Sequence, residues 1–439
     1  MSIHRTTHRR RRLVAPLVAA TSLALALSAC GSDDEGVSAE DAKDQAADLV
    51  GILGLEDTAD LGGDLTWDLG ATLTLSGPTA ANSKAMQNAI DLAVQQIKAA
   101  GGPSIEVSVK DIGAPDPVKA KQAIEELGAE GVPAKITTMG DGLGAMLADT
   151  DKYRILTLDG QGGAQVFTQG TEYFYGTREV APADAVPGAM QWVKEALPDA
   201  ETVGLAGVDL GPLNEPIRAD VKAKIEAGGL EFNGLWETVS PAETDFSSLI
   251  ANVKKNEPDV LYVAFGGAAP GAFAAAAKAA GIESELLAIE FTPEAVTASK
   301  GVLDKDGLKF SMDYFDAENP GNPLADLFVG AYEKAYGAKP DFYAANAYEE
   351  VFAFWQLIRE VVADGGDPDD SAQLKAALEA NPVFPSVYGG DESTPGTLEI
   401  DPETHSVARR PMGVYEYKAG KVTTLATYDV GGADFQLVD

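Results

Sequence analysis

Residues 246–280 decide the fold most directly, and at their centre the chain reads Val260-Leu261-Tyr262-Val263-Ala264-Phe265-Gly266-Gly267. An unbroken apolar run of this length, ended by glycines, is typical of a strand buried on both faces of a parallel sheet. The flanking segments 246–255 and 270–280 carry apolar residues at helical spacing. Helix, buried strand, glycine turn and helix in succession predict one unit of an α/β fold.

The same alternation continues in both directions and falls into two series. The first series predicts strands near 69–75, 105–110, 135–138 and 154–158, with helices over 84–99 and 118–127. Asp116 is the expected N-cap of the second of these helices, with Pro117 in its first turn. The second series predicts strands near 202–207, 232–237, 260–265 and 286–290, with helices over 216–227, 246–255 and 270–280.

The last part of the chain predicts helices over 324–336, 343–362 and 372–378, and strands over 397–400, 414–417 and 422–427. A chain of 439 residues exceeds what one hydrophobic core usually serves. We therefore expect two doubly wound parallel-sheet lobes.

The first thirty residues have the pattern of an exported precursor. Five arginines between positions 5 and 12 precede an apolar run over 13–27, which is too short for a stable membrane-spanning helix. The run ends in Leu27-Ser28-Ala29-Cys30, where the only cysteine follows small residues as the lipidated cysteine of a bacterial lipoprotein does. We predict a signal peptide over 1–29, lipidation of Cys30, and an extracytoplasmic protein anchored to the cell membrane.

Composition excludes several classes of function. The net charge of −35 becomes more negative once the five leader arginines are removed, which disfavours binding to nucleic acid or to anionic lipid headgroups. His405 is the only histidine after the leader, so the chain offers no Cys/His cluster for zinc and little basis for a histidine-dependent nucleophile. We expect no enzyme, no metal and no cofactor.

Residues 30–64 are acidic and poor in aromatic residues, which predicts a solvated tether. Fully extended at ~3.5 Å per residue, it would reach roughly 120 Å. A short helix is possible inside it, because Ser38 and Asp41 resemble a capping box and four apolar residues follow at helical spacing: Ala46, Leu49, Val50 and Leu53.

Ligands of open parallel sheets bind beyond the carboxyl ends of the strands, so the turns there are the candidate site. Glycine in these turns lets backbone N–H groups approach an anion, although it also serves simply to turn a strand into a helix. Asp209 and Glu290, at two strand ends, are either ligand contacts or solvated charges. The candidate ligand-binding residues are Ser76, Asn82, Asp141, Gly142, Leu143, Gln161, Gly162, Gly163, Asp209, Leu213, Ala268, Glu290 and Phe291.

One motif favours a different class of function. Gly140, Gly142 and Ala145 have nearly the spacing of a dinucleotide-binding turn, and Asp159 ends the next strand as a ribose-binding acid would. The motif lies in the third strand–helix unit rather than the first, and an exported protein has no evident supply of nicotinamide. An oxidoreductase is therefore the weakest alternative.

Several motifs together resemble branched-chain amino-acid-type periplasmic binding proteins, and the resemblance covers nearly all of the chain from Trp67 onward. The most specific is Thr244-Asp245-Phe246-Ser247-Ser248-Leu249-Ile250. The others are Pro258-Asp259-Val260-Leu261-Tyr262, Gly266-Gly267, Ala280-Gly281, Leu75-Ser76-Gly77-Pro78, Asn88-Ala89-Ile90-Asp91-Leu92-Ala93 and Gly101-Gly102.

The resemblance implies a type I periplasmic-binding-protein fold, with two α/β lobes joined by three crossovers and a small-molecule solute in the cleft between them. It implies a monomeric receptor that delivers its solute to the permease and ATPase subunits of an ABC importer. The lobes would comprise 65–181 with 314–383, and 182–313 with 384–439. By the same analogy Glu290 matches the acidic residue that holds an amino acid's ammonium group.

The chain departs from this family at other site positions. Where amino-acid binders place serine and threonine hydroxyls, the chain has Asp141-Gly142-Leu143 and Gly160-Gln161-Gly162-Gly163, and the expected tyrosines are replaced by Leu213, Ala268 and Ala269. We hypothesise a solute that is bulkier or less zwitterionic than leucine. The run 396–405 resembles the tail of the amide- and urea-type branch, which keeps those solutes open, with His405 interpreted as a turn residue.

Aromatic residues in the last part of the chain are expected in two different environments. Tyr314, on a crossover, is expected to face the cleft, whereas helical spacing places Phe352 and Trp355 in the core.

A ligand-sensing lipoprotein without a transport role is the alternative function from another class.

Overall fold

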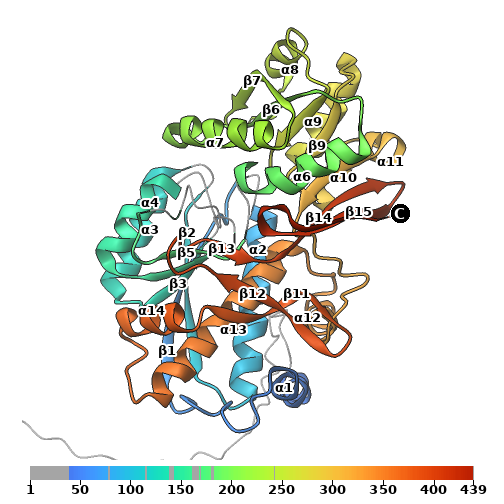
Figure 1. The fold of residues 1–439 in the computed structure, drawn as a ribbon. Helices are drawn as coiled ribbons and strands as arrows, with labels where there is room; N and C mark the ends of the chain where they lie inside the picture. The colour runs from blue at the N-terminus through green and yellow to red at the C-terminus, as the bar shows by residue number, and fades with distance from the viewer. Residues whose placement is uncertain are drawn as a thin grey trace, which may run out of the picture. The chain divides into compact units, whose positions relative to one another are not determined.

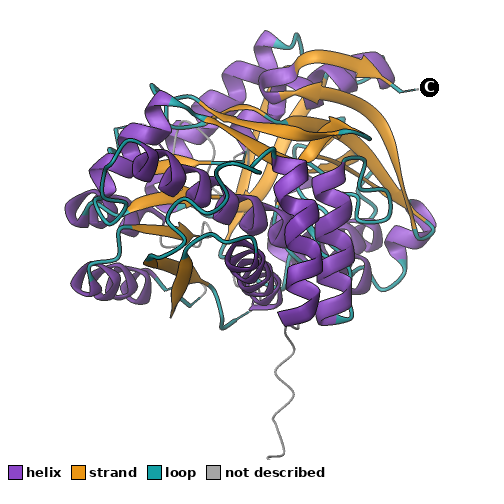
Figure 2. Ribbon diagram, turned by 90° about the horizontal axis from the view of Figure 1, so that it is seen from below, coloured by secondary structure: helices purple, strands orange, loops and turns teal. Residues whose placement is uncertain are grey.

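The computed structural model describes residues 39–77, 80–113, 116–137, 143–160, 168, 170–178, 182–241 and 243–438. The predicted signal peptide and Cys30 lie outside these residues, as do Gly140, Asp141, Gly142, Gln161, Gly162 and Gly163. Leu143 begins a helix whose first side chains are also outside the description. Helices flank the strands in Figure 2.

The first sheet contains five parallel strands in the order β2-β1-β3-β4-β5. Their bounds are β1 (Thr66–Leu73), β2 (Ser104–Asp111), β3 (Ala134–Thr137), β4 (Leu156–Asp159) and β5 (Phe174–Gly176). The helices between them are α2 (Ala80–Ala99), α3 (Pro117–Glu130) and α4 (Leu143–Tyr153). Asp116 caps α3 as expected, accepting hydrogen bonds from the amides of Val118 and Lys119.

The second sheet has eight strands in the order β16-β15-β14-β10-β9-β8-β6-β7. The parallel part contains β6 (Thr202–Val208), β7 (Glu231–Val239), β8 (Val260–Ala264), β9 (Glu285–Ala288) and β10 (Leu308–Met312). The antiparallel strands are β14 (Pro411–Lys418), β15 (Lys421–Asp429) and β16 (Ala433–Leu437). The connecting helices are α6 (Pro182–Ala196), α7 (Asn214–Ala227), α8 (Ser247–Val253), α9 (Ala269–Ala280), α10 (Pro293–Ala298) and α11 (Val302–Asp306).

Helix α6 was not predicted, because Pro187 lies inside it and interrupts the helical signal. Both series of strands and helices are otherwise present, with ends shifted by a few residues. The doubly wound two-lobe architecture predicted from the sequence is therefore confirmed.

The remaining helices, α12 (Pro323–Tyr336), α13 (Phe342–Ala363) and α14 (Ser371–Ala380), belong with the first sheet, since α13 packs on α2 and β3. A third sheet, of β11 (Val383–Asp391), β12 (Thr394–Ile400) and β13 (Val407–Arg409), lies against α12 and α13 (Figure 1). Residues 384–409 were expected in the other lobe. They lie here because Phe384, Val387 and Leu398 bury their side chains in the same core as these helices.

The chain passes between the two large sheets three times, as expected. It crosses after β5 into α6, after β10 into α12, and between β13 and β14. Each passage is short, so a residue beside one strand end can meet residues beside the others. This geometry concentrates groups from all three crossovers at one place.

The expected tether is in part a packed element. Helix α1 (Ala39–Leu53) contacts α2, α12 and β12, and the following turns bury Leu55 and Ala59. Gln96 on α2 donates to Gln45 of α1 at 2.7 Å. The helix predicted inside this segment is confirmed, but the interpretation of all of 30–64 as solvated is wrong, because the apolar stripe of α1 has a partner surface in the folded body.

We expect Leu49→Ala to lower the free energy of unfolding by about 3 kcal/mol, because Leu49 is fully buried and its removal leaves a cavity. Asp48→Ala, on the exposed face of the same helix, is the matched control and should change stability by less than about 0.5 kcal/mol. Chemical denaturation measures both. Equal effects would contradict the packing of α1.

Candidate functional site

Glu290 is a buried carboxylate placed where the two lobes meet. It follows β9, which ends at Ala288, and only 4% of the residue is exposed. Its Oε1 accepts a hydrogen bond from the amide of Gly267 at 2.7 Å, in the turn after β8, and one from the hydroxyl of Tyr343 at 2.8 Å. Tyr343 lies on α13, so the second bond comes from the other lobe.

Burial raises the pKa of the Glu290 carboxyl, and the positive charge of Arg178, together with the hydrogen bonds from Gly267 and Tyr343, opposes this. The net result is a raised pKa, so the buried carboxyl ionises less readily than it would in water. A cation brought into contact with it would favour the ionised form.

Asn82 approaches the same turn from the first lobe. It lies in the first turn of α2 and is buried, and its Nδ2 has no hydrogen-bond partner among the described residues. A Cβ placed on Gly267 would lie 3.6 Å from that nitrogen, and one on Gly266 would lie 3.4 Å from both oxygens of Glu290. The two glycines thus lie beside the amide of Asn82 from one lobe and the carboxylate of Glu290 from the other.

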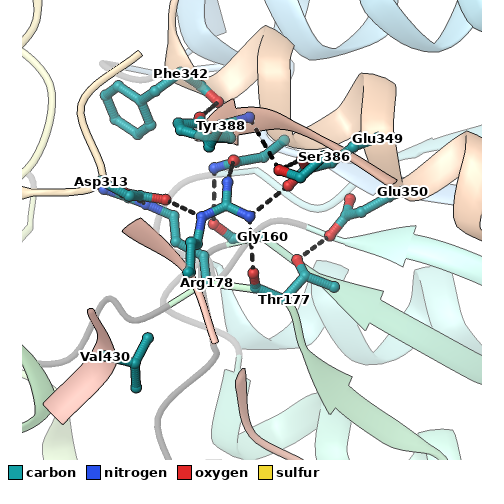
Figure 3. A network of polar contacts seen from close by, with 12 residues as sticks. Gly160, Thr177, Arg178, Asp313, Phe342, Glu349, Glu350, Ser386, Tyr388 and Val430 are labelled. Atoms are coloured by element: carbon teal, nitrogen blue, oxygen red, sulfur yellow. Dashed lines mark hydrogen bonds and ion pairs between the residues drawn. The ribbon is translucent and has the colours of Figure 1, made fainter. Parts of the chain in front are cut away.

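The three crossovers are joined beside this site by a chain of buried charges (Figure 3). Arg178 follows β5, Asp313 follows β10 and Arg410 precedes β14. The Nε atoms of the two arginines each lie 2.5 Å from one oxygen of Asp313. All three side chains are at most 2% exposed.

Two residues of helix α13 bind Arg410, which is the last residue of this network of charges. Arg410 donates to Glu349 at 2.5 Å and to the side-chain oxygen of Asn346, and its guanidinium lies 3.9 Å from the centre of the Tyr388 ring. Ser386 donates to the second oxygen of Glu349 at 2.7 Å. The crossovers are thereby fixed to each other and to the first lobe.

The charges of this network cancel internally. Arg178 and Arg410 balance Asp313 and Glu349. Burial raises the pKa of Glu350 well above its usual range, and this carboxyl accepts a hydrogen bond from Thr177 at 2.7 Å. Glu290 forms no ion pair among the described residues, because Arg178, whose charge acts on it, is paired with Asp313.

Four other predicted residues have different surroundings, and one of them, Ala268, directly follows the Gly267 whose amide binds Glu290. Ser76 is exposed and donates to Asp111 at 3.0 Å. Asp209 accepts from the amide of Gly211 and from the side chain of Asn214, which caps the turn after β6. Leu213 packs against the core of the second lobe, and Ala268 is exposed before α9.

Phe291 was predicted to contact the solute, but its ring stacks on Phe310 at 4.7 Å and on Tyr417 at 4.9 Å. Tyr314, expected in the cleft, joins the same cluster, 5.2 Å from the ring of Tyr415. Burial raises the pKa of Tyr314 to about 12. The cluster forms around Phe310 of β10 and Tyr415 of β14, which are paired across the sheet, and Phe291 and Tyr314 pack against Phe310. Phe352 and Trp355 are buried, as predicted.

Asp159 is fully buried, and its charge acts on Lys135, whose pKa is lowered by burial to about 7. An acid in this place is not presented to a ribose hydroxyl. Within the part of the chain that the structure describes, no group of three or more His, Cys, Asp or Glu residues could hold a metal ion. Among these same residues, none of the helices is both long and apolar enough to cross a membrane.

Arg178, Asp313, Arg410 and the contact of Tyr343 with Glu290 were not predicted from the sequence. A signal was present, because Asp313 follows the apolar run of β10 directly and Arg410 adjoins β14. Charged residues next to buried strands can equally be solvated. Only the convergence of the crossovers distinguishes the two cases.

Comparisons with known proteins agree with this architecture. The profile of a family described as "Periplasmic binding protein" matches residues 66–421. The "Leu/Ile/Val-binding protein homolog 3" of Brucella melitensis is 24% identical over 366 residues, which are 81% of this chain and 93% of that protein.

Two solved structures illustrate the likeness of fold. A solute-binding protein of an ABC transporter from R. palustris, in complex with benzoate, has a TM-score of 0.69 at 22% identity and covers 85% of this chain and 98% of its own. The branched-chain amino acid transporter substrate-binding protein LivJ from Streptococcus pneumoniae, in complex with isoleucine, has a TM-score of 0.67 at 22% identity and covers 85% and 99%.

Proposed function

Since the chain belongs to the periplasmic binding protein family, we propose that it is the extracytoplasmic solute receptor of an ABC importer and that it holds a cationic amino group against Glu290. The proposed receptor is a monomer and carries out no chemical reaction. The solved relatives bind solutes as different as benzoate and isoleucine. The fold therefore does not determine which solute is bound, because the residues of the site do.

The observation that carries the proposal is the burial of the Glu290 carboxyl without an ion pair among the described residues. Arg178, the cation whose field reaches this carboxylate, is already paired with Asp313. An anionic solute such as a benzoate would be repelled there, whereas an ammonium group would form a charge-assisted hydrogen bond with a carboxylate that is largely out of water. Asn82 supplies a free amide donor for a neutral oxygen of the same solute.

The other site positions favour a solute larger than leucine or without its carboxylate. The hydroxyl-bearing residues of amino-acid binders are absent at 141–143 and 160–163, and no lysine or arginine occurs there to replace them. Small residues such as Ala268 leave volume. Polyamines and bulky amino acids fit this description and also carry a cationic nitrogen.

A thermal-shift screen of the protein from Gly31 onward, confirmed by calorimetry, tests the class of solute. The panel contains branched-chain and larger amino acids, polyamines, amides, urea and benzoates. A solute at about 100 times its Kd should add about 2.7 kcal/mol to stability. Binding only by compounds with a cationic nitrogen supports the proposal. Binding by benzoates alone would overturn it.

Affinity for such a solute should rise with pH through the raised pKa of Glu290 and then level off. Below that pKa the carboxyl is protonated and cannot pair with a cation, whereas above it the carboxylate is available. Calorimetry from about pH 5 to about pH 9 measures this, and at the acid end binding should release a proton into the buffer. An affinity that decreases as the pH is raised through the acid half of this range would contradict the role of Glu290.

Lipidation of Cys30 is part of the proposal. Because α1 begins at Ala39, residues 30–38 can separate the folded body from the lipid by no more than about 30 Å. We expect Cys30→Ala to release the protein into the medium, which cell fractionation measures. Solute uptake in a strain lacking the gene separates transport from sensing, since a sensor would leave uptake unchanged.

A further inference from the structure

The two carboxylate oxygens of Glu290 differ in their contacts. Oε1 accepts from both the Gly267 amide and the Tyr343 hydroxyl, which uses its two acceptor positions. We propose that Tyr343 is a positioning residue of the solute site, whose hydroxyl orients Glu290 and keeps it ionised for the solute's cation. This rests on the proposed function in that Glu290 is taken as the solute's partner.

The hydroxyl of Tyr343 is held in place by its surroundings. The residue lies in the first turn of α13, whose N-cap Asp341 accepts from the amide of Ala344 at 2.9 Å. Its ring contacts that of Phe342, with centroids 4.1 Å apart, and Phe342 in turn packs under the guanidinium of Arg178. One turn further on, Asn346 and Glu349 bind Arg410. The side chain of Tyr343 therefore cannot move without disturbing the buried charges of the crossovers.

The proposed route of a solute's cation to Glu290 passes Gly266. This residue is exposed, and it has no side chain to cover the carboxylate that lies beside it. Tyr343 and Gly267 approach Oε1 alone. A cation entering at Gly266 would thus meet a carboxylate whose orientation is already set, which reduces the ordering that binding requires.

The charged groups around Glu290 explain why a donor is needed there. Burial raises its pKa, Asp313 adds to this, and Arg178, Gly267 and Tyr343 lower it. Asp341, whose own pKa is raised by burial to about 7, faces Glu290 and Glu294. Burial and Glu290 raise the pKa of Tyr343 well above its usual range, so its hydroxyl stays a donor. Without it, the balance moves toward a protonated Glu290.

The test is the titration of Glu290, followed by carboxyl carbon NMR of ¹³C-glutamate-labelled protein and assigned with Glu290→Gln. Tyr343→Phe should move the midpoint to higher pH by about 1 unit or more, since a donor to the ionised form is lost. Tyr348→Phe is the matched control, because its buried hydroxyl, on the same helix, donates to Gln96 at 2.6 Å. It should leave the midpoint unchanged.

A midpoint that stays in place in folded Tyr343→Phe would overturn the role of Tyr343. So would an equal movement in Tyr348→Phe, since that would reflect general loosening of α13. If Tyr343→Phe does not fold, Tyr343→Leu provides a second variant without the hydroxyl. The titration needs no solute, so a silent solute panel counts against the proposed function alone.

Discussion

Asp313→Asn is expected to cause the largest loss of stability of any single charge removal in the described residues, about 3–5 kcal/mol. The substitution leaves two fully buried guanidinium groups, those of Arg178 and Arg410, without the carboxylate on which both depend. Arg410 keeps Glu349, but Arg178 keeps no ion pair among the described residues. Denaturant unfolding of the purified protein measures the change.

Two comparisons separate this mechanism from a general effect. Asp326→Asn removes an exposed aspartate from the first turn of α12 and should change stability by about 0.5 kcal/mol or less. Adding Arg178→Met to Asp313→Asn should restore part of the loss, because one of the two unpaired cations is removed. Strictly additive single and double variants would contradict the coupling of the crossovers through Asp313.

Glu290→Gln is expected to reduce affinity for an amine-bearing solute about 100-fold or more, because a buried carboxylate paired with ammonium is replaced by a neutral amide. Stability without solute should be unchanged or higher, since the substitution removes a buried negative charge that lacks its own cation. Calorimetry and thermal unfolding measure the two quantities on one preparation. Loss of affinity with retained stability is the combination that identifies a binding residue.

Glu294→Gln is the matched control for this variant. Glu294 is an exposed carboxylate four residues further along, in the first turn of α10, and it should change affinity by about twofold or less. Unchanged affinity in Glu290→Gln would remove the basis for a cationic solute. The site would then have to be sought among the other strand ends, beginning with Asp209.

Much of the architecture could be predicted from local patterns. The run Val260–Ala264 lies in a central strand, and Gly266 and Gly267 form the turn after it, because a fully apolar segment closed by glycines has few other stable arrangements. The helix over 39–53 followed from its apolar stripe, but its burial did not, since the stripe alone does not reveal a partner surface. The same holds for 384–409, which packs on α12 and α13.

Glu290 was named a candidate from its place after a strand, because parallel strands present their carboxyl ends at one edge of a sheet, whereas Asn82 lies in the first turn of α2. The solute contact of Phe291 stays a prediction, because its ring packs on Phe310 and Tyr417 through tertiary contacts that its position after a strand does not reveal. By itself the sequence determined the succession of strands and helices and the acid at position 290. Only the tertiary structure decided that Tyr343 meets this acid and that Asp313 joins Arg178 to Arg410, because residues far apart in the chain converge where the crossovers fold together, and no local pattern records that convergence.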